Sequence, residues 1–497
     1  MIEYGQDRSG RIGALPQEKG VEADAAEAAA AGFLVGRFRW VDGIGWHRYD
    51  AGVWRNGVAT RTELLDSIRQ GIRYQIDEFR TAGDREQARL WTSLLTNQRI
   101  QAVAEIAKGL NGVLTAHQAL DHGPLLVNCR NGVFNLATGL LDRHNPRYLL
   151  TKQAGAEYDP HATSRTWSML LEAVPVDDRP WLQLRMGQAI TGYSEESLVL
   201  TVGGGQNGKT AFMKAIMRAF GDYASIIPHR ILHVGNGQHP TELMELRGRR
   251  LVLMEETPEE GQLDPHQLKT IIGTPEISAR RMRQDPITFK ATHSLFINTN
   301  HYPQVPSTDH GTWRRLLAVR FPFRFVNPGT VDKLGAGERW GDPDIKNMIE
   351  RDADLPAAAL AWIIEGALRW QKDPNRMHEL PPSVSASTKE WRADSDVCFQ
   401  FARDHLTMGP NRLLPGAFMV DKFNEWLTSQ GKRKWSNRLI HARMSESLPA
   451  ALGFQSSYTF VKVRADHEVG IADPFDARRY ALTIGKTARA YVDLTYA

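Results

Sequence analysis

Residues 198–210 read LVLTVGGGQNGKT, an apolar strand-like run that leads directly into a glycine-rich loop. The loop matches G-x-x-x-x-G-K-[ST] in full, and apolar side chains recur every four residues from Phe212 to Phe220, which predicts a helix ended by Gly221. Strand, glycine loop and helix allow backbone N–H groups to surround phosphates at a helix N-terminus. We therefore expect Lys209 to contact the β- and γ-phosphates of ATP and the Thr210 hydroxyl to ligate Mg²⁺. The predicted nucleotide-binding residues are Gly203, Gly204, Gly205, Gln206, Asn207, Gly208, Lys209 and Thr210.

The composition is that of a globular protein of several domains. The chain has 497 residues, of which 42% are hydrophobic and 24% charged, which excludes a mainly disordered or fibrous protein. No apolar run approaches the roughly 20 residues of a membrane-spanning helix, and no secretory signal is visible at the N-terminus, so we expect a cytoplasmic protein without a membrane partner. Cys129 and Cys398 are the only cysteines, too few for a disulfide framework or a cysteine zinc site. Because the net charge is only +4, affinity for nucleic acid must come from local basic clusters.

Two adjacent acids follow a second apolar run. Residues 251–254 read LVLM and precede Glu255 and Glu256. In a parallel sheet buried on both faces such a run is a central strand, and groups at its C-terminal end face the crevice in which nucleotides bind. One glutamate can hold Mg²⁺ through water while the other polarises the attacking water, and the sequence leaves the order of these roles open. Thr210 and Glu255 are taken as the metal-side pair; the alternative is a solvated strand end.

A third strand-like run, over residues 294–300, ends in amide side chains. Asn300 is expected to hydrogen-bond the γ-phosphate or the attacking water, and Asn298 is the other candidate for this role. The alternative is that the asparagine only forms a turn after the strand. Further along, Arg314 and Arg315 stand before another apolar run. A guanidinium supplied by a neighbouring subunit can neutralise the charge that develops during phosphoryl transfer. Which arginine would do so is open, and a surface arginine pair is the alternative.

Two basic segments are candidates for binding DNA. Residues 276–290 alternate apolar and polar positions around a turn, which predicts a β-hairpin. Residues 432–443 carry five basic residues and no acid. Residues 431–435 join predicted helices over 422–427 and 436–448, and predicted strands over 458–464 and 479–484 would complete a winged helix. A solvated charged surface is the alternative in both segments. The predicted DNA-binding residues are Arg280, Arg281, Arg283, Lys290, Lys432, Arg433 and Lys434.

Together these residues resemble the superfamily-three helicases, most closely the helicase module of phage, plasmid and poxvirus-type primase-helicases. The AAA+ core of that family has a P-loop, a strand ending in paired acids, a basic hairpin, a strand ending in Thr-Asn and a Trp-Arg-Arg finger, in this order. The corresponding segments here are 203–210, 251–256, 277–290, 296–300 and 313–315. The resemblance extends over about 120–390.

This resemblance implies a hexameric ring with ATP at the subunit interfaces and single-stranded or forked DNA in the central channel, moved in the 3′ to 5′ direction. Many members of the family also carry an upstream primase domain. Residues 1–120 show no paired-aspartate motif for two metals, so we do not expect primer synthesis by this chain. A separate primase or polymerase would then be a partner.

The expected fold is α/β, with an AAA+ P-loop core on a parallel central sheet, an α+β N-terminal region and a helical plus winged-helix-like C-terminal region. The expected function is an ATP-driven, ring-forming DNA helicase or translocase for replication of a phage or mobile element. The alternatives are an ATP-switched DNA-binding initiator or scaffold, and an NTPase that remodels a protein partner. The predicted limits are a flexible leader at 1–32, an N-terminal domain at 33–150, a helical collar at 151–195, the core at 196–330, a helical segment at 331–392 and the winged-helix-like domain at 393–497.

Polar residues rich in glycine and proline over 326–354 are the expected domain boundary. The other predicted elements are short strands over 38–54, helices over 62–79, 84–110 and 167–190, and a hairpin over 131–141.

Overall fold

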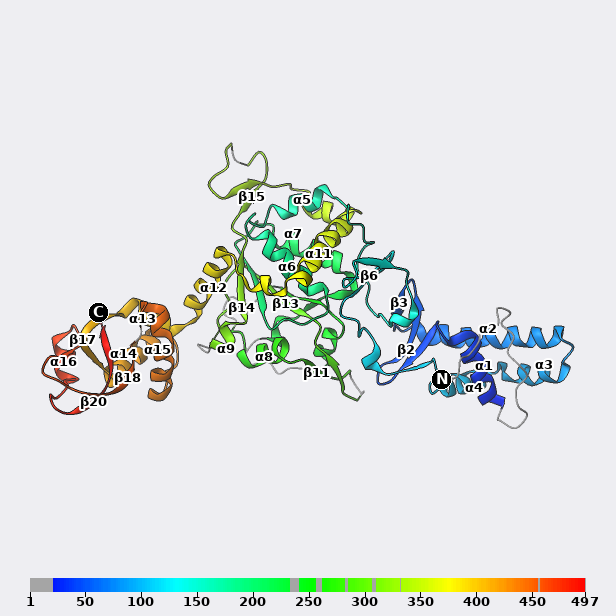
Figure 1. Cartoon of the computed structure of the whole chain (residues 1–497), viewed down its shortest axis with the longest axis horizontal. Coiled ribbons are helices and arrows are strands. Elements are labelled where there is room, and N and C mark those ends of the chain that lie inside the picture. The colour runs from blue at the N-terminus through cyan, green and yellow to red at the C-terminus, as the bar shows by residue number, and fades with distance from the viewer. Residues whose placement is uncertain are drawn as a thin grey trace.

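The computed structural model describes residues 21–232, 241–255, 262–281, 285–305, 310–330, 332–454 and 456–496. These residues form an N-terminal, a central and a C-terminal body that follow one another along the chain (Figure 1). The N-terminal body, in blue, and the C-terminal body, in orange and red, lie on opposite sides of the central body. The glycine-rich loop belongs to the central body.

The central body is built on a sheet whose described strands stand in the order β14-β8-β13-β10-β9. Every neighbouring pair of these strands runs parallel. Strands buried on both faces are near-continuous apolar runs, and β8 and β13 are buried along their whole length. The predicted α/β class and the predicted parallel sheet are confirmed. In the order of the sheet the strands span Leu316–Arg320, Leu198–Val202, Ser294–Thr299, Leu251–Glu255 and Ala224–Ile227.

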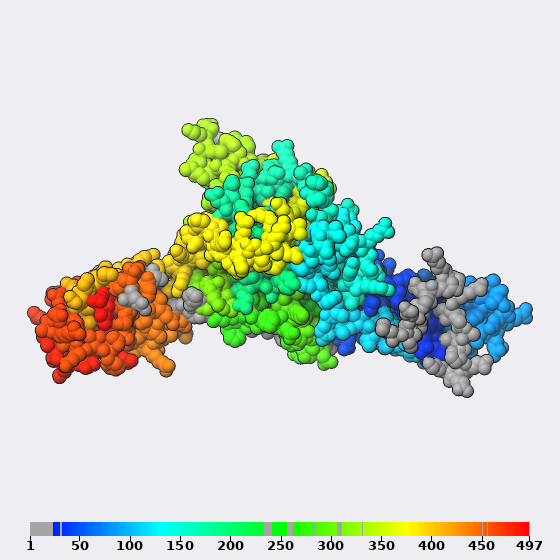
Figure 2. Space-filling view, viewed as in Figure 1, coloured from blue at the N-terminus to red at the C-terminus, as the bar shows by residue number. Residues whose placement is uncertain are grey.

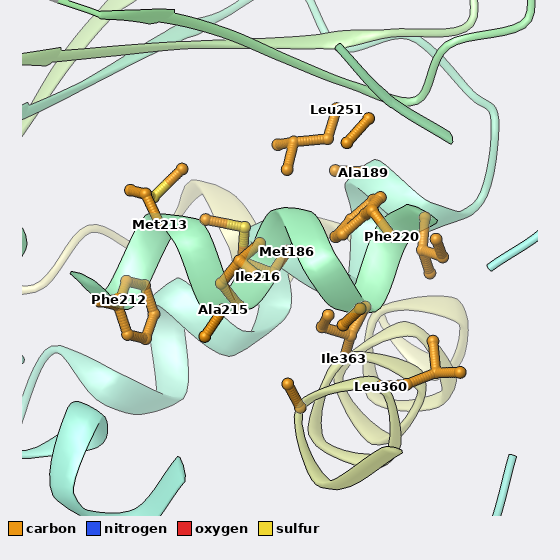
Figure 3. Packing of buried hydrophobic residues seen from close by; sticks show 14 of the residues in the cluster. Met186, Ala189, Phe212, Met213, Ala215, Ile216, Phe220, Leu251, Leu360 and Ile363 are labelled. Carbon is orange, nitrogen blue, oxygen red and sulfur yellow. The ribbon is translucent and has the colours of Figure 1, made fainter. Parts of the chain in front are cut away.

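Helix α7 (Lys209–Phe220) follows the glycine-rich loop and is buried between the sheet and other helices. Its residues Phe212, Ile216 and Phe220 are 0% exposed, as their four-residue spacing predicts. Figure 3 shows this face packed against side chains from α6, α11 and strand β10. The helix ends at Gly221, whose φ of +55° favours glycine. The loop is therefore anchored to a helix whose apolar face is buried in the core.

Two further helices pack in the same hydrophobic cluster as α7. Helix α6 (Arg179–Ile190) and helix α11 (Leu355–Lys372) cross with their backbones in close contact. The run predicted as one helix over 167–190 is instead α5 (Arg165–Leu171) and α6, because Pro180 starts a new helix. Proline suits the first turn of a helix and disfavours its interior, so the periodic pattern continues while the helix does not.

The polar segment at 326–354 is not a boundary between separate cores. One hydrophobic cluster contains residues from Val127 to Val384, on both sides of this segment. The segment includes a parallel pair of strands, β15 (Arg324–Val326) and β16 (Glu338–Trp340), followed by α10 (Ile345–Arg351). Figure 2 shows this part of the chain standing out from the central body. Glycine and proline mark an exposed excursion here, and composition alone does not distinguish that from a linker.

The N-terminal body packs helices against a small sheet of order β3-β2-β1-β4. The predicted short strands and the first predicted helix are confirmed. The run predicted as a helix over 84–110 is interrupted, because the Thr96 side chain accepts a hydrogen bond from Arg99 N and caps a new helix. The strands are Phe38–Val41 (β1), Gly45–Asp50 (β2), Val53–Arg55 (β3) and Leu114–Thr115 (β4), and the helices are Thr60–Thr81 (α2), Arg85–Thr92 (α3) and Asn97–Ala107 (α4).

The predicted flexible leader is wrong over its second part. Helix α1 (Val21–Ala29) buries Ala25, Ala26, Ala28 and Ala29 in the same cluster as α4. Alanine lets two helices approach closely and has the highest helix propensity, so an alanine-rich run can be a packed helix. Residues 1–20 lie outside the described residues.

The C-terminal body contains the two predicted helices as α14 (Gly416–Ser429) and α15 (Asn437–Leu452), and the first predicted strand as β18 (Tyr458–Lys462). The strand predicted over 479–484 is wrong. Asp473 accepts hydrogen bonds from Phe475 N and Asp476 N and starts helix α16 (Pro474–Arg479), and the strand comes later. That later strand, β20 (Thr487–Tyr496), pairs antiparallel with β18 and with β17 (Leu406–Pro415) in a sheet of order β18-β20-β17-β19.

The two predicted hairpins are confirmed. Strands β5 (Leu126–Cys129), β6 (Gly132–Asn135) and β7 (Leu140–Asp142) pair antiparallel in sequence order. Strands β11 (Glu276–Ala279) and β12 (Ile287–Lys290) form the basic hairpin. The remaining helices and short strand are α8 (Pro265–Gly273), α9 (His310–Trp313), α12 (Pro382–Ser395), α13 (Val397–His405) and β19 (Glu468–Val469). Among the described helices, none has the length and hydropathy needed to span a bilayer.

The crossing of α6 and α11 depends on glycine. A Cβ atom at Gly366 would lie 2.2 Å from Gln183 O, and one at Gly187 would lie 2.2 Å from Ala367 N. We expect Gly366→Ala to lower the free energy of unfolding by at least about 2 kcal/mol, because the two backbones must separate. Chemical denaturation measures this. At Gly109 a Cβ would meet nothing closer than 3.9 Å, so Gly109→Ala is the control. Equal unfolding midpoints for both variants would contradict the close crossing.

Candidate functional site

The glycine-rich loop joins the C-terminal end of β8 to the first residue of α7. A Cβ at Gly203 would lie 2.5 Å from Phe321 O, so only glycine fits there. Gln206 and Gly208 have φ of +62° and +78°, left-handed conformations that bend the chain back before the helix. The Asn207 side chain accepts a hydrogen bond from Lys209 N at 3.2 Å and holds the end of the loop. The loop is thus curled at the N-terminus of a buried helix, where anions bind favourably.

Lys209 is buried, with an exposed fraction of 3%. Its ammonium donates to Thr299 O at 2.5 Å, to Asn300 Oδ1 at 3.0 Å and to Gly203 O at 3.3 Å. Burial lowers the pKa of this ammonium to about 8. The structure therefore brings together Lys209 and Asn300, the two residues that the sequence assigns to the terminal phosphate.

Asn298 and Asn300 occupy separate places in the site. Asn298 Nδ2 lies 3.4 Å from Thr210 Oγ1, and Asn298 Oδ1 accepts from Thr201 Oγ1 at 3.3 Å. Asn298 is buried and contacts the predicted Mg²⁺ ligand, whereas Asn300 contacts the lysine. The sequence treats these asparagines as competitors. The signal that could have separated them is their spacing of two along the chain, with Asn298 inside β13 and Asn300 just after its last residue, Thr299.

Glu255 ends β10 at the same edge of the sheet as the loop. It stands in register with Asn298, which stands in register with Thr201 of β8. Glu255 is therefore two strand spacings, roughly 10 Å, from β8. Its side chain is exposed. Glu256, the second predicted acid, lies outside the described residues.

Arg314 and Arg315 are not brought to this site within one chain. The next residue, Leu316, pairs with Leu198 at the first residue of β8, so both arginines lie at the opposite end of the sheet from the loop. Arg315 donates to Gly311 O at 2.6 Å and forms an ion pair with Glu196 at 2.8 Å. Arg314 is exposed. Of the two, Arg314 has its guanidinium available at the surface.

A pocket of about 620 Å³ opens beside the loop. It includes Thr210 and Ala211 but not Lys209, whose ammonium faces β13 instead. Eight of its lining side chains are apolar or aromatic, and seven are polar or charged. The lining residues are Met169, Leu170, Glu172, Ala173, Gln206, Asn207, Gly208, Thr210, Ala211, Phe325, Asn327, Trp340, Gly341, Asp342, Pro343, Ile345 and Lys346.

The predicted DNA-binding residues lie on two bodies. Arg280, Arg281 and Lys290 are exposed on the β11–β12 hairpin, whose Ile277 and Phe289 are buried against the central body. In the C-terminal body, three basic side chains are exposed between α14 and α15. These are Lys432, Arg433 and Lys434. Arg283 lies outside the described residues.

Comparison with known proteins points to replication proteins of large DNA viruses. The family described as "D5 N terminal like" matches residues 32–175, and a family of unknown function (DUF5906) matches residues 201–315. "Putative primase C962R" of African swine fever virus (isolate Tick/Malawi/Lil 20-1/1983) is 26% identical over 356 residues, covering 68% of this chain and 36% of the viral protein. "Putative helicase L207/L206" of Acanthamoeba polyphaga mimivirus is 24% identical over 405 residues, covering 77% of this chain and 41% of the viral protein.

The chain thus spans well under half the length of these relatives. It is similar to proteins named as primases or helicases. Among solved structures, the apo C-terminal region (305–718) of NrS-1 aligns with a TM-score of 0.42 at 14% identity, covering 79% of this chain and 89% of that one.

The lowered pKa of Lys209 gives the loop a testable pH dependence. An anion bound at the loop needs the charged ammonium, so the affinity for inorganic tripolyphosphate should fall up to tenfold per pH unit above about pH 8. Isothermal titration calorimetry from pH 7 to 9.5 measures this. Lys209→Met should bind weakly at every pH. Affinity that stays constant to pH 9.5 in the unmodified protein would contradict the assignment.

Proposed function

We propose that this chain is an ATP-driven motor that acts on DNA during replication, a ring-forming helicase or translocase of the superfamily-three AAA+ type. The observation that carries this proposal is the meeting of Lys209, Thr210, Asn298, Asn300 and Glu255 at one edge of a parallel sheet. The similarity to viral proteins named as primases and helicases supports a role in replication.

The contacts of Lys209 suggest how a triphosphate would be held. The Lys209 ammonium donates hydrogen bonds to Thr299 O and to the Asn300 amide oxygen. A terminal phosphate would replace these two oxygens as the acceptor. Asn300 would then be released to bond the phosphate or the attacking water. The arrangement makes Asn300 responsive to whether phosphate is present, which is the task of a sensor.

The donor groups at the same edge suit Mg²⁺. Hydroxyl and carboxylate oxygens are ligands that Mg²⁺ prefers, and Thr210 and Glu255 supply them from the two sides of β13. Asn298 holds the Thr210 hydroxyl in place from between them. Bound Mg²⁺ would neutralise the β- and γ-oxygens. Glu255, or Glu256 beside it in sequence, would orient the water that attacks the γ-phosphate.

A second subunit would complete the site. Arg314 and Arg315 lie at the far end of the sheet from the loop of their own chain, so an arginine could reach a triphosphate only across an interface. Because Arg315 is held by Glu196 and Gly311 O, Arg314 is the better candidate for the finger. Hexameric assembly, DNA in the central channel and 3′ to 5′ movement follow from the resemblance to the superfamily.

The pocket beside the loop would take the nucleobase. The lysine end of the loop points to β13, so the γ-phosphate lies there and the sugar and base extend past Thr210 and Ala211. That direction leads to apolar groups and to Trp340, which is 47% exposed on β16 and able to stack on a base.

Mixing two inactive variants tests the shared site. Lys209→Ala removes the phosphate contact and Arg314→Ala removes the finger, so each alone should lose at least about a thousandfold in ATP turnover. In rings mixed at equal ratio about a quarter of the interfaces would have both parts intact and should regain activity. Arg89→Ala, on an exposed face of α3, is the control that should stay active.

No recovery at any mixing ratio would count against a finger in trans. The same assay, run with and without single-stranded DNA, separates the motor from its rivals. Stimulation by DNA together with strand separation supports the motor, whereas turnover indifferent to DNA would favour an NTPase that acts on protein.

Replacing Trp340 tests the base pocket. Trp340→Ala should weaken ATP binding about two- to tenfold, the worth of one aromatic stack, while leaving tripolyphosphate binding unchanged. Calorimetry measures both affinities. Phe475→Ala removes an aromatic side chain that is 76% exposed in the C-terminal body and should change neither. Equal losses for ATP and tripolyphosphate would mean that Trp340 supports the loop and does not contact the base.

A further inference from the structure

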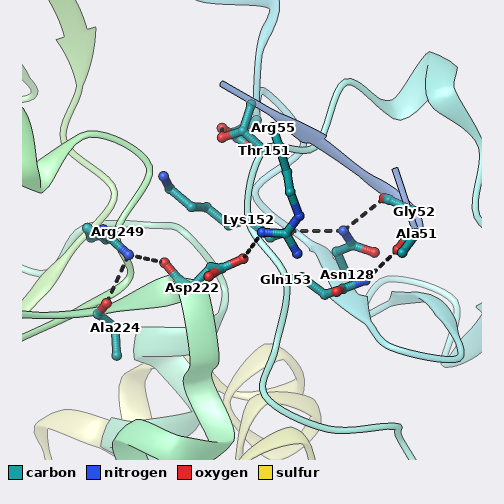
Figure 4. A network of polar contacts seen from close by, with 11 residues as sticks. Ala51, Gly52, Arg55, Asn128, Thr151, Lys152, Gln153, Asp222, Ala224 and Arg249 are labelled. Carbon is teal, nitrogen blue, oxygen red and sulfur yellow. Dashed lines mark hydrogen bonds and ion pairs between the residues drawn. The ribbon is translucent and has the colours of Figure 1, made fainter. Parts of the chain in front are cut away.

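The junction between the N-terminal and central bodies gathers basic side chains that the proposed ATP site does not use. They come from segments far apart in sequence: Arg55 on β3, Lys152 after β7, Arg247 and Arg249 before β10, and Arg281 after β11. Figure 4 shows part of this junction, with Arg55, Lys152 and Arg249 near Asp222.

Two of these side chains have structural partners. Arg249 donates to Asp222 O at 2.5 Å and to Ala224 O at 3.0 Å. Arg55 forms an ion pair with Asp222 at 3.6 Å. Asn128 and Gln153 add hydrogen bonds from the central body to the Gly52 and Ala51 carbonyls of the N-terminal body. This part of the junction fastens the two bodies together.

The charged ends of Lys152 and Arg247 have no such partners. Within the described part of the chain, neither makes a side-chain hydrogen bond or ion pair, and in Figure 4 no contact reaches the Lys152 ammonium. Burial lowers the pKa of both groups. Cations that are partly removed from water without hydrogen bonds destabilise the fold, so their own packing does not account for them.

The acid and the histidine that face this pair do not neutralise it. Asp121 is the nearest carboxylate, and its oxygens accept from Thr151 N at 2.6 Å and Thr151 Oγ1 at 2.5 Å. His47 is buried, and burial lowers its pKa to about 4, with Arg247 and Lys152 acting in the same direction. His47 is therefore neutral near pH 7. Asp121 is already hydrogen-bonded to Thr151, and Asp222, the other carboxylate that acts on Lys152, already pairs with Arg55.

The DNA-binding hairpin adjoins this pair. Arg281, exposed at the end of β11, is close enough to Arg247 to lower its pKa. The N-terminal body also touches the hairpin, because the His117 ring lies 3.2 Å from Thr288 O and Gly43 faces Ile287. Arg281 thus connects the basic residues of the hairpin with Arg247 at the junction, and the N-terminal body contacts the hairpin.

Lys152 lies against the residue that follows Arg247, because a Cβ atom at Gly248 would be 3.2 Å from Lys152 Cε and 3.3 Å from Asp121 Oδ2. We propose that Lys152 and Arg247 bind a backbone phosphate of a nucleic-acid strand that runs from the hairpin along the junction with the N-terminal body. A guanidinium and an ammonium on neighbouring segments are suited to a phosphate, which accepts from both. The proposal rests on the proposed function, since the strand is the one that the hairpin grips. It gives the N-terminal body a role in holding DNA.

The test measures binding of a fluorescein-labelled oligodeoxythymidine by anisotropy over a range of salt concentrations, with the full chain. Lys152→Met/Arg247→Met should lower affinity about tenfold at low salt and reduce the salt slope by about 1.4, the value for two phosphate contacts on a single strand. ATP binding should not change. The control Arg85→Met/Arg89→Met removes two exposed charges from α3 and should leave affinity and slope unaltered.

Three comparisons interpret the result. Arg281→Met should weaken oligonucleotide binding in the same assay. If the unmodified chain binds ATP but no oligonucleotide, the proposed motor function is contradicted as well as the proposed phosphate site. Lys152→Met alone keeps Arg247 near Asp121, so this variant should fold and melt no earlier than the unmodified protein. Its salt slope should fall by about 0.7, half of the change expected for the double variant. Wild-type affinity and slope in the double variant would overturn the proposal, as would a loss confined to binding of inorganic phosphate.

Discussion

A buried ammonium without an acidic partner is the constraint on which the site depends. Lys209 is almost fully inaccessible and donates to two carbonyls and one amide oxygen, and no described carboxylate pairs with it. Neutral oxygens stabilise a buried cation less than a charged group does, which agrees with a pKa lowered to about 8. Under the proposed function an anion bound at the curled loop at the start of α7 would supply the partner of opposite charge.

The order of the strands determines what meets that anion. Strand β13 stands between β8, which carries the loop, and β10, which carries the acid. Its two asparagines therefore face the loop from the middle of the site, one toward the lysine and one toward Thr210. The arginines before β14 lie at the other end of the sheet because a parallel strand begins where its neighbour begins. A single topology thus gathers one set of groups at the loop end of the sheet and places the two arginines at the opposite end.

The bodies on either side are connected to this core in different ways. The helices that follow the protruding 326–354 segment share the hydrophobic cluster of α7, so the chain returns to the same core after this segment. The N-terminal body is joined by polar contacts and ion pairs and touches the basic hairpin. Its position beside the hairpin gives it access to any strand that the hairpin holds.

Local pattern in the sequence determined the strands, the glycine loop, helix α7 and the basic hairpin, because their apolar periodicities and turn residues act over a few positions. It also placed Lys209, Thr210, Glu255 and Asn300 at element ends. It misjudged α1, where buried alanines look like a leader, and the strand predicted over 479–484, which starts at the last residue of helix α16 and ends before strand β20. Only the tertiary structure decided which strands are neighbours, that Asn298 reaches Thr210, and that Lys152 lies beside Arg247. These pairings join residues as far apart as 88 and 95 positions, and they depend on the packing of whole elements, which no local spacing encodes.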